Sequence, residues 1–218
     1  MMVTVSATSV AKEVMRRMMR VRALAALIVG ALLAAVLVVP ATADAKSLPT
    51  TAVYRFYNQG TGAHFYTASV AERDHVIATW SGIFTYEGPA FYLYDEFAYD
   101  TSVDPAMIGP EVPTTPVHRF YNVRNGSHFY TTSAEEADHL RSTDAKMFPY
   151  DGVGFQAYSQ PSEDLRLVPV YRFYHKQNGS HFYTISPEEK ALVQIFYADT
   201  YRFEGVAFYA MSGYVLIR

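Results

Sequence analysis

The sequence predicts an α+β fold in which three tandem β-β-α-β repeats with approximate three-fold symmetry share one core. Three observations lead to this prediction. A stretch of the form V-x-R-F-Y…H-F-Y-T occurs three times, a helix-start signal follows each copy, and a Gly lies 24 residues after each His. A period near 50 residues is typical of small units that bury a common core together. A β-trefoil is the alternative, and the three helix starts argue against it.

The recurring stretch lies at Val53–Thr67, Val117–Thr131 and Val170–Thr184. Each copy opens with a short apolar and aromatic run, continues through a Gly-containing turn and ends in a second such run, which predicts two strands. The second and third copies carry Asn125-Gly126 and Asn178-Gly179 at the turn. Asn-Gly favours the two-residue type I′ turn, so each copy is predicted to open with a β-hairpin.

A helix start follows each hairpin. Ser69, Ser133 and Ser186 each precede a Glu by three residues, which is the pattern of a capping box. Helices of about ten residues are expected from there, at Val70–Trp80, Ala134–Thr143 and Pro187–Tyr197. A closing strand that carries the repeated Gly is expected after each helix, at Thr85–Tyr94, Pro149–Tyr158 and Arg202–Met211.

Residues 1–43 have the layout of a secretory signal peptide. Four Arg precede an uncharged run from Ala23 to Val39, and small residues at Ala41 and Ala43 form a cleavage site. An uncleaved anchor is the alternative. We expect a mature chain of residues 44–218, a single domain with repeats at about 53–98, 117–160 and 170–215, secreted to the extracellular space or cell envelope and without a stable membrane span.

The amino-acid composition limits the classes of partner that the protein is expected to bind. The expected mature part holds 13 basic and 20 acidic residues, and an acidic chain repels phosphate backbones, so we expect no nucleic-acid partner. The chain contains no Cys, so its stability must come from packing and not from disulfides. All 18 Tyr, all 14 Phe and the one Trp lie after residue 43, which supplies a large aromatic area for burial or binding.

Alternation along the hairpin separates two faces. With Asn125-Gly126 as the turn, Arg119 faces Thr132 and Tyr121 faces Tyr130. The Phe residues then point into the core. The other face carries Arg, Tyr, His and Tyr in every copy, and these are the candidate ligand-binding residues: Arg55, Tyr57, His64, Tyr66, Arg119, Tyr121, His128, Tyr130, Arg172, Tyr174, His181 and Tyr183.

Two interpretations of this face compete. In the structural one, each Arg pairs with the acid of its own closing motif (Glu87, Asp151 or Glu204), and each His holds a turn carbonyl. In the functional one, Tyr rings stack on sugars while Arg and His bind hydroxyl groups in a groove used up to three times. Weak sites used together gain avidity.

Metal, cofactor and catalytic signals are weak. The sequence has no H-x-x-x-H or H-E-x-x-H pair and no Cys, so we expect no metal and no cofactor. It has no G-x-S-x-G or Walker motif. An active site needs unlike groups in one place, whereas these polar residues come in three similar sets. The sequence therefore favours a non-catalytic protein over an enzyme. For a hydrolase, the candidate catalytic residue is His175, where the other copies have Asn.

The RFYN…HFYT…YEG pattern resembles a family of secreted bacterial and fungal repeat domains catalogued as a domain of unknown function. The resemblance covers Val53 to about Met211, and His175 and Gly154 depart from its pattern. It implies an accessory or surface-binding role. We therefore expect a secreted, non-catalytic binding module for cell-envelope or extracellular glycan, or for a surface protein. A structural or adhesive surface protein is the first alternative, and a small secreted hydrolase is the second.

Overall fold

A computed structural model describes residues 50–94, 113–163 and 165–213, which belong to one compact unit of residues 45–218. The expected signal peptide lies outside the described residues. Within the described ranges, no helix has the length and apolar character needed to cross a membrane.

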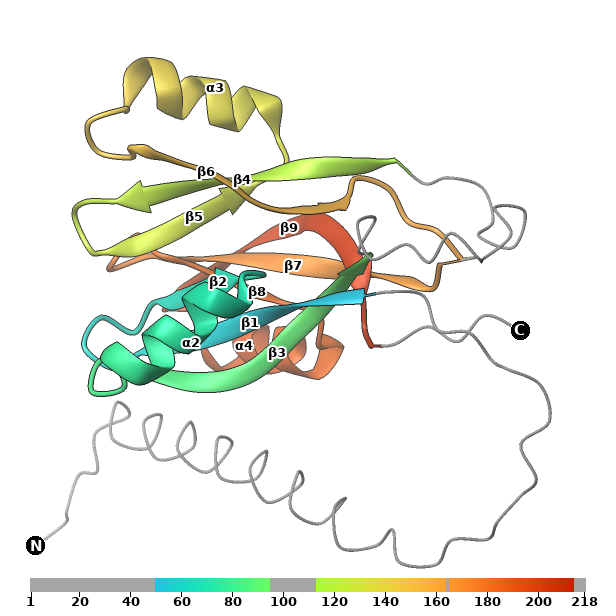
Figure 1. Cartoon of the computed structure of the whole chain (residues 1–218), viewed down its shortest axis with the longest axis horizontal. Helices are drawn as coiled ribbons and strands as arrows, with labels where there is room; N and C mark the ends of the chain where they lie inside the picture. The colour runs from blue at the N-terminus through green and yellow to red at the C-terminus, as the bar shows by residue number, and fades with distance from the viewer. Residues whose placement is uncertain (1–49, 95–112, 164, 214–218) are drawn as a thin grey trace, which may run out of the picture. The chain divides into compact units, whose positions relative to one another are not determined.

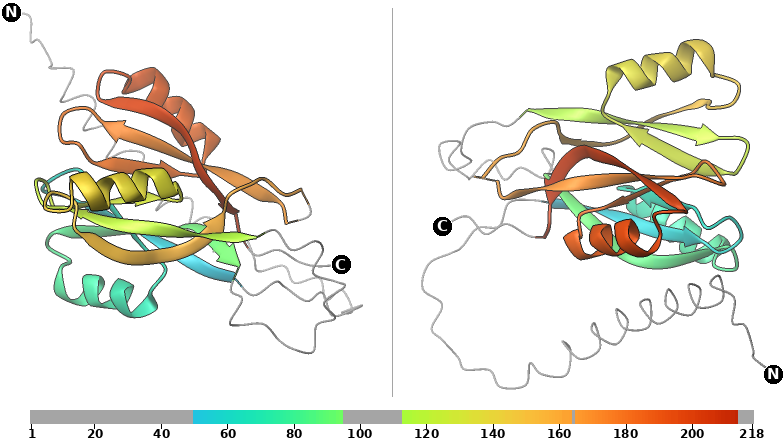
Figure 2. Two further views of the ribbon diagram at one scale, coloured as in Figure 1. Left: turned by 90° about the horizontal axis from the view of Figure 1, so that it is seen from above. Right: turned by 180° about the vertical axis from the view of Figure 1, so that it is seen from behind.

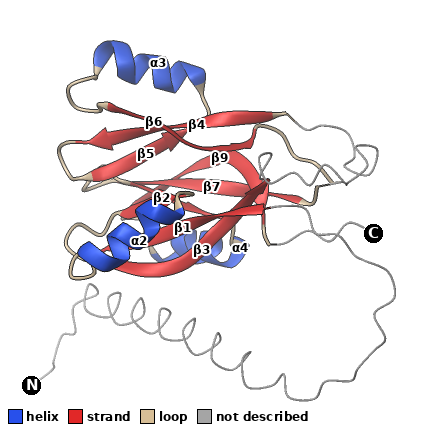
Figure 3. Cartoon of the chain, viewed as in Figure 1, coloured by secondary structure: helices blue, strands red, loops and turns tan. Residues whose placement is uncertain are grey.

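The elements follow one order, strand, strand, helix, strand, in each copy of the motif (Figures 1 and 3). Their bounds are β1 (Thr50–Asn58), β2 (His64–Thr67), α2 (Val70–Thr79) and β3 (Phe84–Tyr94), then β4 (Thr114–Asn122), β5 (Ser127–Thr131), α3 (Ala134–Thr143) and β6 (Tyr150–Tyr158), then β7 (Leu167–His175), β8 (His181–Thr184), α4 (Pro187–Phe196) and β9 (Tyr201–Met211).

The predicted α+β fold class is wrong, and so is the β-trefoil alternative: the order strand, strand, helix, strand recurs, but the strands do not form three separate β-β-α-β units. The nine strands form one antiparallel sheet, in the order β2-β1-β3-β9-β6-β4-β5, with β7 pairing β8 and β9 off this path. Strand β9 joins the three copies through the pairs Tyr92–Met211 and Tyr158–Tyr209. The described part of the chain is therefore mostly β, with three short helices, α2, α3 and α4, at its outside (Figure 2).

The helices begin where the capping signals indicated, but they contribute little to the core. The Ser69 side chain accepts a hydrogen bond from the Glu72 N–H at 3.1 Å, and Ser133 and Ser186 do the same for Glu136 and Glu189. In α2 only Val76 is buried, in α3 only Ala137, and in α4 no residue. A capping box indicates where a helix begins but not how many of its side chains are buried. The prediction from sequence therefore overestimated the contribution of the helices to the core.

The hairpin register differs from the prediction by two residues. Arg119 pairs with Tyr130 and Tyr121 pairs with His128, because the loop has four residues and not two. The Asn122 side-chain oxygen accepts a hydrogen bond from the Arg124 N–H, with 3.0 Å between oxygen and nitrogen, and this bond closes the longer turn. A shift of two keeps the side-chain alternation, so the predicted division into two faces survives.

The core contains side chains from all three copies. Equivalent Val, Tyr and Phe residues, and a fourth position occupied by Leu or Ala, meet in one central cluster: Val53, Tyr66, Phe91, Leu93, Val117, Tyr130, Phe155, Ala157, Val170, Tyr183, Phe208 and Ala210. The predicted inward Phe residues are buried, but two of the pairs lie in separate small clusters beneath α2 and α3. Both faces of each hairpin are thus covered, and the Arg/Tyr/His/Tyr face is the one nearest the centre.

Candidate functional site

The twelve candidate residues lie at three levels along the hairpins. Tyr66, Tyr130 and Tyr183, here called the inner tyrosines, are fully buried. The three Arg and three His form a middle level. Tyr57, Tyr121 and Tyr174, here called the outer tyrosines, lie nearest the hairpin turns and are half-buried or exposed.

The inner tyrosines form a closed ring of hydrogen bonds. Each hydroxyl donates to the backbone carbonyl of the next inner tyrosine and accepts from that residue's N–H. The donated bonds run from Tyr66 to Tyr183, from Tyr183 to Tyr130 and from Tyr130 to Tyr66, at 2.7–2.8 Å. The accepted N–H bonds are 2.9–3.1 Å long. The rings also meet edge to face, with centroids 5.5–5.7 Å apart.

This ring satisfies the open edges of β2, β5 and β8. Each of these strands pairs with a single neighbour, and its other edge faces the centre. A buried backbone N–H or C=O without a partner is costly, and here a tyrosine hydroxyl serves one of each. Burial raises the pKa of all three hydroxyls well above the ordinary value. These residues are therefore committed to the fold and unavailable to a ligand.

Each Arg of the middle level pairs with the acid of its own closing strand, as the structural interpretation predicted. The Nε atoms of Arg55, Arg119 and Arg172 lie 2.7, 2.7 and 2.9 Å from Glu87, Asp151 and Glu204. The Gly after each acid has a φ of 90° to 105°, in the region that favours glycine, beside an irregularity in strand pairing. The repeated Gly thus shapes the backbone that carries the acid.

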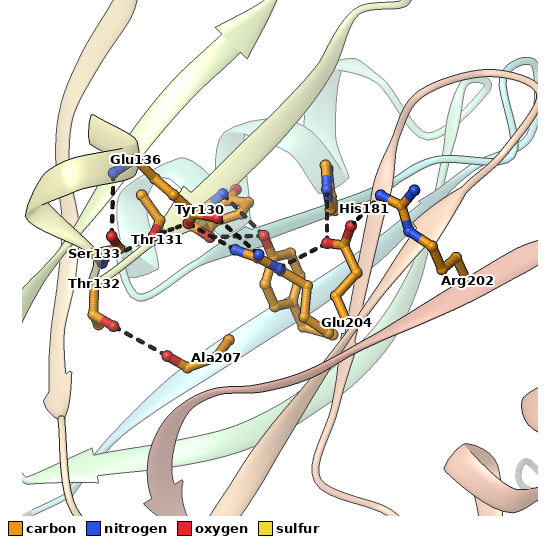
Figure 4. Close-up of polar contacts among 11 residues, drawn as sticks. Tyr130, Thr131, Thr132, Ser133, Glu136, His181, Arg202, Glu204 and Ala207 are labelled. Atoms are coloured by element: carbon orange, nitrogen blue, oxygen red, sulfur yellow. Dashed lines mark hydrogen bonds and ion pairs between the residues drawn. The ribbon is translucent and has the colours of Figure 1, made fainter. Parts of the chain in front are cut away.

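Each Arg also contacts the preceding copy in a cyclic order, which sequence reasoning missed. Arg119 binds Glu72 at 2.9 Å, Arg172 binds Glu136 through two bonds of 2.9 Å, and Arg55 binds Glu189 at 3.2 Å. These Glu residues come from the capping boxes, a motif in which the Glu side chain accepts from the Ser N–H. Here a Thr hydroxyl accepts from that N–H instead. Figure 4 shows Glu136 on one side of this network and Glu204 on the other.

The guanidinium groups lie over Phe rings in the same cyclic order. Arg55 lies over Phe182, Arg119 over Phe65 and Arg172 over Phe129, at 5.4–5.9 Å from the ring centroids. The hydroxyl bonds of the inner tyrosines, the Arg ion pairs with the capping-box Glu residues and the Arg–Phe contacts therefore all join each copy to the preceding one.

Each His pairs with an acid and not with the predicted turn carbonyl. His64, His128 and His181 lie 3.3–3.5 Å from Glu87, Asp151 and Glu204. Burial opposes the charge of Glu87, yet the His64 hydrogen bond and the Arg55 charge lower its pKa to about 2. Burial and the Arg119 charge lower the pKa of His128 to about 4. His128 is therefore neutral at neutral pH.

The outer tyrosines remain accessible. Each ring lies 5.3 Å from the His of its own copy, and Tyr121 is 39% exposed. The three hairpin turns beside them lie at one end of the described unit (left in Figure 1). The Asn125 side chain donates to the Asn178 carbonyl at 2.6 Å, and Asn178 donates to the Thr61 carbonyl at 2.9 Å. We call this end, with its turns and outer tyrosines, the rim.

His175 acts as a turn residue. Its Nδ1 accepts hydrogen bonds from the N–H groups of Gln177 and Asn178, as the Asn58 side chain does for Gly60 and Thr61. The Asn-to-His difference therefore has a structural explanation. Among residues 50–94, 113–163 and 165–213, no group of three or more His, Asp or Glu side chains could hold a metal ion.

Comparison with known proteins agrees with the repeated motif. No curated protein and no solved structure matches the chain. A family described as a domain of unknown function, DUF5648, matches residues 37–106 and again residues 103–211. These matches cover most of the sequence, and the chain therefore belongs to the DUF5648 family of domains of unknown function.

Proposed function

We propose that this protein is a secreted, non-catalytic binding module that takes cell-envelope or extracellular glycan at the rim. The supporting observation is the partial exposure of the outer tyrosines beside a buried scaffold. Tyr121 is 39% exposed, whereas the inner tyrosine of the same hairpin, Tyr130, is 1% exposed. Tyr rings present an apolar face and a hydroxyl, which suits a sugar ring with its own hydroxyl groups.

The middle level favours a rigid scaffold over catalysis. The three Arg are engaged with acids from two copies, and His175 is engaged in its turn. Of the twelve candidate ligand-binding residues, we therefore keep the three outer tyrosines and the half-buried His beside each of them. Similar sites at one end of a domain suit a repeating polymer, because several weak contacts act together.

The test is retention of residues 44–218 on insoluble peptidoglycan, chitin and cellulose, with soluble sugars as competitors. The key variant replaces Tyr57, Tyr121 and Tyr174 with Ser. The control replaces Trp80, which is 45% exposed beyond the end of α2, with Ser. We expect one polymer to retain the protein and soluble sugars to release it. The triple variant should lose this retention and the control should keep it, while both variants remain folded.

An adhesive or structural surface protein is the second candidate, and the extent of the buried network favours it. Under that role, no polymer retains the folded protein. Loss of retention in the Trp80 variant alone would move the site from the rim to the α2 surface and contradict the proposal.

A further inference from the structure

The third copy carries an Arg directly opposite its outer tyrosine, where the other two copies have uncharged residues. Arg202 is opposite Tyr174 in the β7–β9 pairing, and its equivalent in the first copy is Thr85, opposite Tyr57. In the second copy, Pro149 stands beside Tyr121, whose N–H donates to the Pro149 carbonyl at 3.0 Å. An Arg directly opposite the outer tyrosine is therefore specific to the third copy.

Arg202 is held in place and remains accessible. Its guanidinium carbon lies 4.8 Å from the centroid of the Tyr174 ring, and its Nη2 lies 2.7 Å from Glu204 Oε1. The side chain is nonetheless 61% exposed. Figure 4 shows Glu204 between His181 and Arg202. A stacked guanidinium with one N–H engaged keeps other N–H donors for a ligand.

The local charge also differs between copies. In the first copy, Arg55 is shared by Glu87 and Glu189, and in the second, Arg119 is shared by Asp151 and Glu72, so each cluster has one more acid than Arg. In the third, Arg172 is shared in the same way and Arg202 cancels the excess. Burial opposes the charge of Glu204, but hydrogen bonds from His181 and Arg202 lower its pKa to about 2, so it stays ionised.

We propose that the third copy's rim, formed by Arg202 and Tyr174, binds the carboxylate of an acidic sugar. This inference rests on the proposed glycan-binding function and specifies its ligand. Arg is the residue that matches carboxylate geometry, and its hydrogen bonds to a charged partner are the strong ones. The other two copies have Thr85 and Pro149 at this position, which offer no cation to a carboxylate, whereas a neutral sugar can use the rings of Tyr57 and Tyr121.

The test is calorimetric titration of residues 44–218 with hexagalacturonate and with its fully methyl-esterified form, which keeps the sugar backbone and removes the charge. We expect one site for the acid form and at least roughly tenfold weaker binding of the ester, as loss of a charge-assisted hydrogen bond predicts. Arg202→Thr, which installs the residue of the first copy, removes the preference for the acid form. Arg124→Thr removes the same charge from an exposed turn position in the second copy and leaves the preference intact.

The converse variant, Thr85→Arg, places a guanidinium opposite Tyr57 and raises the stoichiometry for hexagalacturonate from one to two. Equal binding of acid and ester, an unchanged preference in Arg202→Thr, or equal losses in Arg202→Thr and Arg124→Thr would each overturn the inference. If neither hexamer binds while a neutral polymer retains the protein through the outer tyrosines, the inference fails and the proposed function stands. If no glycan is retained at all, both fail.

Discussion

The inner and outer tyrosines occupy the same hairpins, nine residues apart in sequence, and have opposite environments. Tyr66 is 1% exposed, and its hydroxyl makes two hydrogen bonds to the backbone of another copy. Tyr57 is half-buried at the rim beside its own turn. Both recur in every copy. Recurrence in every copy therefore indicates that a tyrosine has a role. Its distance from the centre of the domain decides whether that role is structural or whether the side chain is accessible to a ligand.

The largest expected effect concerns the buried level. Arg55→Met leaves Glu87 and Glu189 without their shared cation, and removal of one partner of a buried ion pair costs about 3–5 kcal/mol. We expect a loss of this size in the free energy of unfolding measured with urea. Arg124→Met, at an exposed turn position, serves as the control and should change stability by less than about 0.5 kcal/mol. Equal small losses in both variants would mean that the cyclic ion-pair network does not support the fold.

The second effect is a dependence of stability on pH. The pKa of His128 is lowered from 6.5 to about 4 in the fold, so the unfolded chain binds the proton more readily. The contribution of neutral His128 to the free energy of unfolding is present above pH 6.5 and is lost as the pH falls toward 4. Glu87 adds a second loss of folding stability as the pH falls from about 4.5 toward 2, because its pKa in the folded protein is about 2 and lies below the ordinary 4.5.

The measurement is the urea unfolding free energy of the wild type and of His128→Gln between pH 7 and pH 3. We expect the wild type to lose about 2 kcal/mol more than the variant between pH 6.5 and 4. Parallel curves would show that His128 titrates normally in the folded protein.

The smallest effect sharpens the description of the rim. The Asn125 and Asn178 side chains link the second turn to the third and the third turn to the first, and Thr61 stands at the equivalent position of the first turn. Thr61→Asn supplies the amide that a third such bond needs. We expect a gain of about 0.5–1 kcal/mol in the unfolding free energy. A loss of stability would mean that the three turns are not equivalent in geometry.

Local features of this protein were predictable from sequence, and its assembly was not. The helix starts follow from Ser69, Ser133 and Ser186, and the division of hairpin faces follows from strand alternation. The fold class was wrong because capping signals do not report burial, and because single strand pairs such as Tyr92–Met211 leave no mark in the sequence. The turn length was wrong because Asn122 closes a four-residue loop with its side chain.

For the site, the pairing of each Arg with its own acid was predictable because both recur at fixed spacing. The contacts with Glu72, Glu136 and Glu189 were not, because the same residues satisfy a capping pattern that explains them locally. The threefold recurrence of Glu at that position was the available signal. Nothing in the sequence distinguished Tyr66 from Tyr57, since both alternate onto the same face.

The most direct test compares two substitutions that each remove a single oxygen atom from the same hairpin, Tyr130→Phe and Tyr121→Phe. Tyr130→Phe leaves a buried N–H and a buried carbonyl of Tyr66 unpaired, which costs about 2 kcal/mol or more in the unfolding free energy. Tyr121→Phe, at the rim, should change it by less than about 0.5 kcal/mol. Equal effects of the two substitutions would contradict the separation of a structural inner level from an accessible rim.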